Sequence, residues 1–136
     1  MRPRPTDPIR SLDWAELISV DERLPLRAVA SVLQRHHVGA ALVAQRTSEI
    51  GIVTERDLVA AIASGADLDE VQAGMIASQR LVTVDPADRI VDVARRLIDE
   101  EVRHVAVVDR DMVVGVLSIR DLLVALVDDY PDDPAG

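Results

Sequence analysis

Two four-residue stretches carry the side chains that could do chemistry, and each pairs a hydroxyl with a carboxylate. They are Thr54-Glu55-Arg56-Asp57 and Ser118-Ile119-Arg120-Asp121. On the first turn of a helix, residues three positions apart face the same way. A carboxylate placed there can accept hydrogen bonds from both hydroxyls of a ribose, as acidic residues do in dinucleotide folds. The helix N-terminus, together with Arg56 or Arg120, would favour a phosphate.

The same spacing also fits a purely structural role. Ser/Thr-x-x-Asp before an apolar run is a form of capping box, in which the pair satisfies the helix's own N–H groups. Asp is shorter than the Glu or Gln usually found there, which favours a carboxylate that faces outward. Gly51 and Gly115 precede the two stretches and lack side chains, so a ligand could approach the backbone closely. Both interpretations stay open, and the two roles can coexist.

The two stretches belong to an internal duplication. Gly115 lies 64 positions after Gly51, and the same offset continues without a gap from Ile18/Val82 to Ile62/Leu126. Among those 45 pairs, 13 are identical. The repeat therefore organises the chain. Each half alone would have about 60 residues and would bury little surface, so we expect the halves to share one core.

Composition limits the class of protein. The 136 residues are 49% hydrophobic with no Phe, one Trp and one Tyr, so Val, Leu, Ile and Ala must fill the interior of a globular domain. The absence of cysteine fits a reducing compartment, and we expect a cytoplasmic protein with no membrane segment. A formal net charge of −9 disfavours nucleic acid as a partner.

Periodicity predicts a β-α-β-β-α order in each repeat. In the first repeat, residues 14–65, Pro25 would open a helix that ends near Val38-Gly39, and Gly65 would close the second helix. Residues 66–127 would form a connecting helix from Asp67 to Ile76 and the second repeat, where Asp88 is a good N-cap. We expect strands at 18–20, 40–44, 50–53, 81–84, 104–108 and 112–117, and helices from Thr54 and from Ile119.

The two ends of the chain read differently from the repeats. Residues 1–13 contain Pro3, Pro5 and Pro8 among charged residues and are expected to be a flexible arm. Residues 128–136 are acidic and Pro-rich and are expected to be a flexible tail.

This pattern resembles the cystathionine-β-synthase (CBS) domain family. The resemblance lies in Val-Thr-Val-Asp, in Arg103-His104-Val105-Ala106-Val107-Val108-Asp109, and in Gly followed by two hydrophobic residues and Thr/Ser-x-Arg-Asp-Leu. It covers about residues 14–127 and occurs twice. It implies an α/β (α+β) fold in which two CBS repeats pack about a pseudo-twofold axis, called a Bateman module, and leave clefts that commonly bind AMP, ADP, ATP or S-adenosylmethionine.

The resemblance implies a role for further residues. Thr54, Asp57, Ser118 and Asp121 would hold the ribose, and Arg56, Arg120, Arg103 and His104 the phosphate. Repeat 1 has Gly39 and Ala40 where repeat 2 has Arg103 and His104, so the two clefts cannot be equally cationic. A solvated Arg beside a packed His is the alternative. A weaker expectation gives adenine a pocket made of Val20, Val84, Ala40 and Val105.

Catalysis and metal binding have little support. A Ser118–His104–Asp121 grouping can be imagined, but the sequence has no Gly-x-Ser-x-Gly elbow, and we expect no enzyme activity. His36 and His37 are adjacent on a helix and point about 100° apart, so we expect surface histidines and no metal site. No cofactor is expected beyond a regulatory adenosine ligand.

The helices that follow Thr54 and Ser118 are apolar nearly all round, which predicts a homodimer through them. We therefore interpret the chain as a free-standing regulatory sensor that binds an adenosine ligand between its repeats and acts on an unidentified protein. A ligand that shifts a 1:99 equilibrium to 99:1 needs about 5.5 kcal/mol of preference, so it should contact both repeats. The alternative is a structural dimerisation module without a small-molecule ligand.

Overall fold

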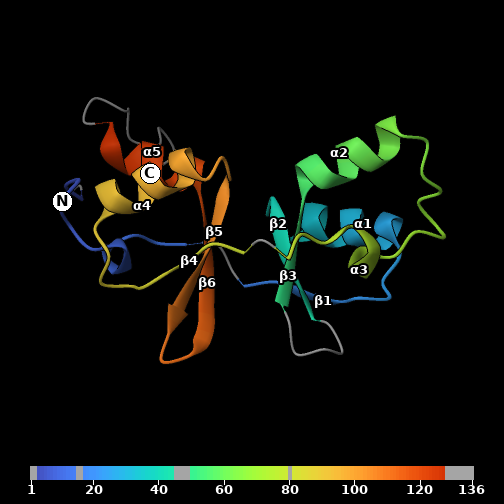
Figure 1. Ribbon diagram of the computed structural model, residues 1–136, viewed down its shortest axis with the longest axis horizontal. Helices are drawn as coiled ribbons and strands as arrows, with labels where there is room; N and C mark the ends of the chain where they lie inside the picture. The colour runs from blue at the N-terminus through green and yellow to red at the C-terminus, as the bar shows by residue number, and fades with distance from the viewer. Residues whose placement is uncertain (1–2, 15–16, 45–49, 80, 128–136) are drawn as a thin grey trace. The chain divides into compact units, whose positions relative to one another are not determined.

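The computed structural model describes residues 3–14, 17–44, 50–79 and 81–127 (Figure 1). The chain divides into two units. One consists of residues 16–81 and is called the repeat-1 unit; the other, the repeat-2 unit, combines residues 1–15 with residues 82–136. Each unit is described by itself below.

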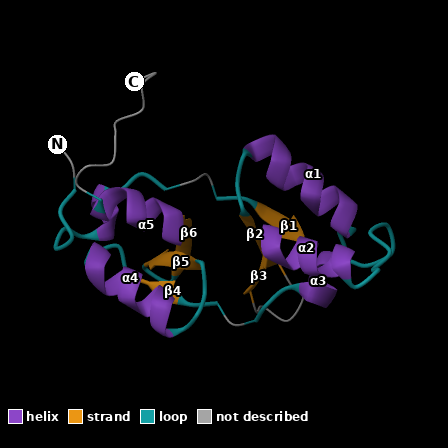
Figure 2. Ribbon diagram, turned by 90° about the horizontal axis from the view of Figure 1, so that it is seen from above, coloured by secondary structure: helices purple, strands orange, loops and turns teal. Residues whose placement is uncertain are grey.

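The repeat-1 unit has a three-stranded sheet in the order β1-β2-β3. β1 pairs with β2 in parallel, and β2 pairs with β3 as an antiparallel hairpin. Helices α1 and α2 lie on one side of this sheet (Figures 1 and 2). The elements are β1 (Ser19–Asp21), α1 (Leu26–His36), β2 (Ala40–Ala44), β3 (Ile50–Thr54), α2 (Glu55–Ala63) and α3 (Ala73–Ile76).

The repeat-2 unit repeats this topology, with a sheet in the order β4-β5-β6. Its antiparallel hairpin turns at Arg110 and Asp111, which have φ values of 52° and 65°. A register shift between Val107 and Val108 leaves one extra residue, Val114, on β6. The elements are the 3₁₀ helix η1 (Ile9–Ser11), β4 (Thr83–Val84), α4 (Ile90–Asp99), β5 (His104–Asp109), β6 (Met112–Ser118) and α5 (Ile119–Leu126).

These elements confirm the predicted mixed α/β class and the two β-α-β-β-α repeats, with boundaries shifted by one or two residues. The helices form where apolar residues recur at helical spacing. Leu26, Val29 and Leu33 are buried on α1, and Ile90, Val93 and Leu97 are the buried residues of α4 at the same repeat positions. The predicted packing of the repeats about a twofold axis stays a prediction.

Each unit has its own hydrophobic core, and the expectation that the halves also share a core stays a prediction. Most of the buried residues of the repeat-1 unit form one cluster around Leu26, Val43 and Val53. Those of the repeat-2 unit form another around Ile90, Val107 and Leu117. In each unit the core lies between the sheet and the helices that cover it (Figure 2).

The sequence led us to expect a flexible N-terminal arm. Over its described residues, the N-terminal segment is instead packed on the rest of its unit. Residues 5–12, here called the strap, pack on the repeat-2 unit, and Ile9 is 0% exposed in its core. Four backbone hydrogen bonds hold the strap: Ile9 N–H to Asp88 O (2.8 Å), Arg10 N–H to Pro86 O (3.0 Å), Ile90 N–H to Asp7 O (2.9 Å) and Val91 N–H to Pro5 O (2.9 Å). Because a buried side chain and paired backbone anchor it, the strap is an integral part of this unit.

The connection between the repeats plays the same part in the repeat-1 unit. The expected connecting helix from Asp67 to Ile76 is wrong, since only Ala73–Ile76 is helical and Gln72 is extended. Instead, the segment docks through three bonds that lie 64 positions from those of the strap: Ala73 N–H to Leu24 O (2.8 Å), Gly74 N–H to Glu22 O (2.7 Å) and Leu26 N–H to Val71 O (3.0 Å). The structural repeat therefore extends through residues 5–12 and 69–76.

Asp88 is not the N-cap of α4. Arg89 holds that position and makes no side-chain cap hydrogen bond. The Asp88 carboxylate instead accepts from the backbone N–H of Asp85 at 2.9 Å, within the turn that receives the strap. Pro25, expected at the first helical position, lies one residue earlier, as the N-cap of α1.

Two further points concern the ends and the membrane. The predicted flexible tail, residues 128–136, lies outside the described residues. Within the described part of the chain, no helix combines the length and apolar character needed to cross a bilayer.

The strap makes a stability prediction. Replacing Ile9 by Ala should destabilise the repeat-2 unit by about 2–5 kcal/mol, because a fully buried branched side chain is lost and a cavity remains. Urea unfolding followed by circular dichroism measures this. The matched control is Arg10→Ala, which keeps the strap backbone and removes an exposed side chain, and should change stability by less than about 0.5 kcal/mol. Equal small effects of both substitutions would contradict a core role for the strap.

Candidate strand–helix junction sites

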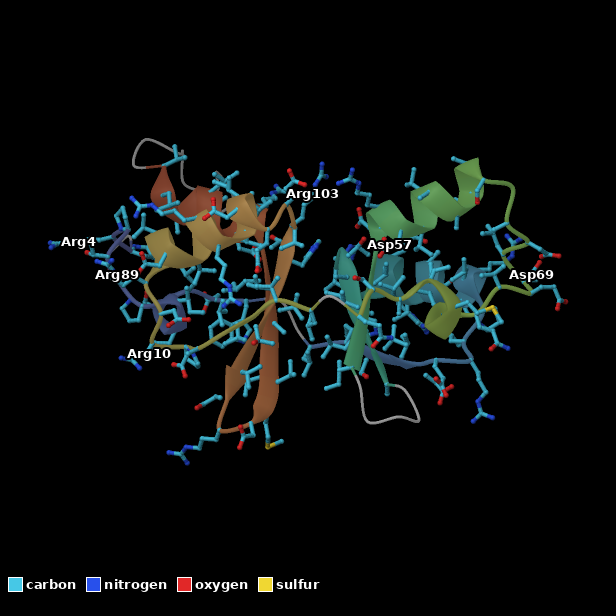
Figure 3. All side chains as sticks on the ribbon, viewed as in Figure 1. Arg4, Arg10, Asp57, Asp69, Arg89 and Arg103 are labelled. Carbon is cyan, nitrogen blue, oxygen red and sulfur yellow. The ribbon has the colours of Figure 1, made fainter. Side chains whose placement is uncertain are left out.

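The Thr54/Asp57 pair forms a reciprocal capping box at the start of α2. The Thr54 hydroxyl accepts from the Asp57 backbone N–H at 3.2 Å, and Asp57 Oδ2 accepts from the Thr54 backbone N–H at 2.8 Å. The Thr54 hydroxyl also donates to Asp57 Oδ2 at 3.0 Å. Figure 3 shows Asp57 at the beginning of this helix.

The Ser118/Asp121 pair forms the same box at the start of α5. Ser118 Oγ accepts from the Asp121 backbone N–H at 3.1 Å, and Asp121 Oδ2 accepts from the Ser118 backbone N–H at 3.0 Å. Capping is therefore confirmed in both repeats. The shorter length of Asp, which favoured an outward-facing carboxylate, does not prevent either aspartate from reaching back to the N-cap.

Capping leaves part of each carboxylate unused. Each Asp accepts through Oδ2, and Oδ1 receives no hydrogen bond from the residues that the structure describes. A carboxylate has about four acceptor positions on its two oxygens, so the cap does not exhaust it. Thr54, Asp57, Ser118 and Asp121 are all half-buried. The geometry thus permits one carboxylate to cap its helix and to accept from a ligand.

The helix N-termini are less available to an anion than the sequence suggested. The first N–H of α2, on Glu55, donates to Gly39 O at 2.9 Å, and that of α5, on Ile119, donates to Arg103 O at 2.7 Å. The third N–H of each helix donates to the capping hydroxyl. Two of the first three N–H groups are therefore occupied in each helix, and side-chain cations must supply most of any phosphate binding.

The strand register brings the other predicted residues to the same corners. His104 lies directly opposite Ser118 on β5 and β6, and Ala40 lies opposite Thr54 on β2 and β3. We call the two sets the repeat-2 junction and the repeat-1 junction. The first consists of Arg103, His104, Ser118, Ile119, Arg120 and Asp121, and the second of Gly39, Ala40, Thr54, Glu55, Arg56 and Asp57.

The arginines of the junctions are open to solvent. Arg56 and Arg120 occupy the second position of their helices and are exposed, as is Arg103, which Figure 3 shows beside the start of β5. His104 is half-buried. The exposed guanidinium groups of the three arginines can move toward an anion. The role of these arginines and of His104 as phosphate ligands stays a prediction.

Gly115 does not leave room for a ligand. A Cβ atom on Gly115 would overlap the indole ring of Trp14, which lies against this position of β6. The backbone of Gly115 is approached closely, as expected, but by the Trp14 side chain of the same unit and not by a ligand. The sequence placed Trp14 before the first strand and gave no signal for this contact, which depends on the strap that leads to it. The role expected for Gly51 stays a prediction.

The four residues expected to contact adenine are buried. Val20 belongs to the core of the repeat-1 unit, and Val84 and Val105 to that of the repeat-2 unit. Val105 is 0% exposed and so offers no surface to a base. Ala40, at 7% exposure, lies outside both core clusters, on the strand position opposite Thr54. Core packing is the role that the structure gives to the three valines.

The resolved pKa shifts belong to two surface ion pairs outside the junctions. The hydrogen bond from Arg27, at 2.7 Å, lowers the pKa of the Asp69 carboxyl, and that from Arg89, at 2.8 Å, lowers the pKa of Asp92. Arg27–Asp69 joins α1 to the connection that docks beside it. A carboxyl whose pKa is lowered by folding stabilises the folded state at pH values above its unfolded pKa, and this stabilisation is lost as the pH falls. Because both ion pairs lie at the surface, the contribution is small.

Neither the imagined hydrolase nor a metal site gains support from the geometry. The Ser118 hydroxyl oxygen accepts a backbone N–H at the helix start, and Asp121 binds the Ser118 backbone. Across the residues described, no group of three His, Asp or Glu side chains could hold a metal ion.

With this geometry established, comparison with known proteins assigns the family. The CBS domain model matches residues 9–64 and again 73–128. The chain belongs to the CBS domain family. The two matches start 64 positions apart, at Ile9 and Ala73, so each begins within a segment that docks on the other repeat. The tandem CBS pair inferred from the sequence is confirmed.

One solved structure and two curated proteins illustrate the similarity. A solved CBS domain protein from Pyrobaculum aerophilum, complexed with AMP, is 34% identical with a TM-score of 0.74, over 84% of this chain and 88% of that one. The mitochondrial CBS domain-containing protein CBSX3 of Arabidopsis thaliana is 30% identical over 91% of this chain and 63% of its own length. An uncharacterised Methanopyrus kandleri protein is 32% identical over 70% of this chain and 50% of its own length. The chain thus spans about half to two thirds of these two curated relatives.

The contact between Trp14 and Gly115 makes a prediction. Gly115→Ala should move the indole and cost about 1–3 kcal/mol, because the added methyl group overfills a packed site. Trp14 is the single tryptophan of the chain, so its fluorescence emission reports the movement directly. In a Trp14→Ala background the same substitution should cost much less. Additive effects in this double-mutant cycle would contradict the contact.

Proposed function

We propose that this CBS pair is a regulatory protein whose strand–helix junctions bind adenosine-containing ligands: AMP, ADP, ATP or S-adenosylmethionine. Thr54 and Asp57, and Ser118 and Asp121, would hold the ribose, and the arginines of the junctions would neutralise phosphate. The ligand is a regulatory one, and no catalytic cofactor is part of the proposal.

The observation that carries this proposal is the half-used carboxylate of each capping box. Asp57 and Asp121 are fixed in place by backbone hydrogen bonds through Oδ2, while Oδ1 takes none from the described residues. Such an acceptor is already oriented, so a ribose diol that donates to it costs little further ordering of the side chain. Half-burial strengthens a charge-assisted hydrogen bond relative to one in open water.

The AMP complex of the Pyrobaculum aerophilum relative supports this choice of ligand. That protein and this chain share the family and 34% of their residues over most of both lengths. Regulation would follow if the ligand binds one conformation of the protein, or of its complex with a target, more tightly than another.

Calorimetry with the wild type and the Asp121→Asn variant tests the proposal. Wild-type protein should bind at least one of AMP, ATP and S-adenosylmethionine. Asn keeps an oxygen that can accept from the Ser118 N–H, so the cap survives, but it removes the charge that a ribose would meet. Affinity at this junction should fall about tenfold to a hundredfold, with the melting temperature nearly unchanged.

The charge-matched control is Asp111→Asn. Asp111 lies at the hairpin turn, at the other end of β6 from Ser118, and Asn tolerates its φ of 65°. This variant should bind like the wild type. Absence of heat and of thermal shift with all three ligands would favour the structural alternative, a dimerisation module without a ligand.

One observation favours dimerisation, either as the sole role of the chain or together with ligand binding. Val59 and Leu123 occupy equivalent positions on α2 and α5 and are 64% and 51% exposed, and Ile62 is 59% exposed. Exposed branched side chains that recur on a helix are typical of surfaces that meet another chain. We propose a homodimer formed through α2 and α5.

Sedimentation velocity tests the dimer with Val59→Glu combined with Leu123→Glu. Charges in an apolar contact should convert a dimer to monomers, while the fold is retained because both side chains are already exposed. Met112→Glu, at a residue 70% exposed on β6, is the control and should leave the dimer intact. A double variant that sediments like the wild type would rule out these helices as the interface.

A further inference from the structure

The two junctions have the same backbone arrangement and opposite charge. In both, the residue before the central strand accepts a hydrogen bond from the first N–H of the helix, and a Thr/Ser–Asp box follows. This common frame puts side chains that are 64 positions apart at equivalent places. Differences between those side chains therefore translate directly into differences between the two sites.

The repeat-2 junction is cationic. The carbonyl of Arg103 accepts from Ile119 N–H at 2.7 Å, which fixes the backbone of Arg103 beside the first turn of α5. Arg120 lies on that turn, and both guanidinium groups are exposed. Against these two positive charges the junction has one carboxylate, Asp121, so its net charge is positive.

The repeat-1 junction is anionic. Gly39 accepts from Glu55 N–H at 2.9 Å in the place of Arg103, and contributes no side chain. Glu55 replaces Ile119 at the first position of the helix and is exposed. Two carboxylates, on Glu55 and Asp57, thus face one guanidinium group, on Arg56, and the net charge is negative.

The nearest charge in sequence that lies outside the two junctions, Glu101, reduces this contrast without removing it. Glu101 lies two residues before Arg103, whereas the equivalent residue in repeat 1 is His37. Glu100 lies 3.7 Å from Arg96, which balances its charge. With Glu101 included, the repeat-2 junction is neutral and the repeat-1 junction keeps one net negative charge, so a difference of one charge remains.

We infer that the two junctions select different adenosine compounds. The repeat-2 junction binds one with a 5′-phosphate, and the repeat-1 junction binds one without phosphate, either neutral or cationic at the 5′ end. The inference rests on the proposed function and deepens it. At the repeat-2 junction, a phosphate is attracted by Arg103 and Arg120. At the repeat-1 junction, Glu55 repels a phosphate and attracts a sulfonium group such as that of S-adenosylmethionine.

Calorimetry with AMP and S-adenosylmethionine, separately and in succession, tests this selectivity. One AMP should bind per chain, and protein saturated with AMP should still bind one S-adenosylmethionine. Asp121→Asn should weaken AMP alone, and Asp57→Asn should weaken S-adenosylmethionine alone, each about tenfold to a hundredfold. Higher salt should weaken AMP binding, because the arginines are exposed and screened.

Reciprocal exchange of the two differing positions provides the matched variants. Arg103→Gly with Ile119→Glu gives the repeat-2 junction the charges of the repeat-1 junction, and AMP affinity should fall about a hundredfold. Gly39→Arg with Glu55→Ile does the reverse, and the protein should then bind two AMP molecules per chain. Among the described glycines only Gly65 has a positive φ, so an Arg at position 39 needs no left-handed backbone.

The outcomes separate this inference from the function on which it rests. Two AMP molecules per wild-type chain, competition between the two ligands, or loss of AMP binding in Asp57→Asn rather than Asp121→Asn would overturn the selectivity while the adenosine function stands. Failure of the wild type to bind either compound would overturn both.

Discussion

Backbone pairing by a segment from outside each repeat is the interaction on which the rest of the structure depends. The strap bonds to Asp88 and Pro86, and residues 71–74 bond in the same way to Leu24 and Glu22. These bonds give hydrogen-bond partners to backbone carbonyl groups in the turn between the first strand and the first helix of each unit. Each of these turns sets the direction of the helix that follows it, α1 or α4, and these helices cover the sheets and bury the two cores.

The capping boxes show how structure and proposed function share one side chain. Asp57 and Asp121 each accept a hydrogen bond through Oδ2 from the backbone N–H of the N-cap residue, where the strand ends and the helix begins. This bond fixes the carboxylate relative to the residue before the central strand. A ligand that binds there meets a group already oriented by folding. The fold therefore constrains these positions in both repeats, while the neighbouring positions Gly39/Arg103 and Glu55/Ile119 are free to differ and can set ligand preference.

The sequence predicted most of the regular structure because its signals are local. The apolar spacing of Leu26, Val29 and Leu33, and Gly65 after α2, each act within a few residues. The 64-residue offset then predicts the same elements in the second repeat. The strap gave no such signal: none of residues 5–12 is identical to its counterpart among 69–76, because backbone groups make most of the contact and any residue supplies those. The three prolines suggested a loose segment, whereas they suit an extended one that docks at an edge.

Only the part of the candidate site that depends on local sequence was predicted. The residue types and spacing of the Thr/Ser–Asp boxes identified the corners, and chain geometry then brought Gly39 and Arg103 to them. Sequence could not tell that two of the first three helix N–H groups would be occupied by backbone and hydroxyl oxygens. Trp14 was equally hidden, since its position against Gly115 depends on how the strap runs.

The placement of the strap has a consequence for synthesis on the ribosome. The repeat-1 unit is continuous, from residue 16 to residue 81, and can close as soon as its last residues leave the exit tunnel. The repeat-2 unit has Ile9 in its core, yet Asp88 emerges about 80 residues later. Ile9 must therefore wait, exposed to water, until the strands and helices that bury it have been made. The entropy of closing this longer loop adds only about 0.4 kcal/mol over the loop from Leu24 to Ala73, so the delay is one of timing and not of stability.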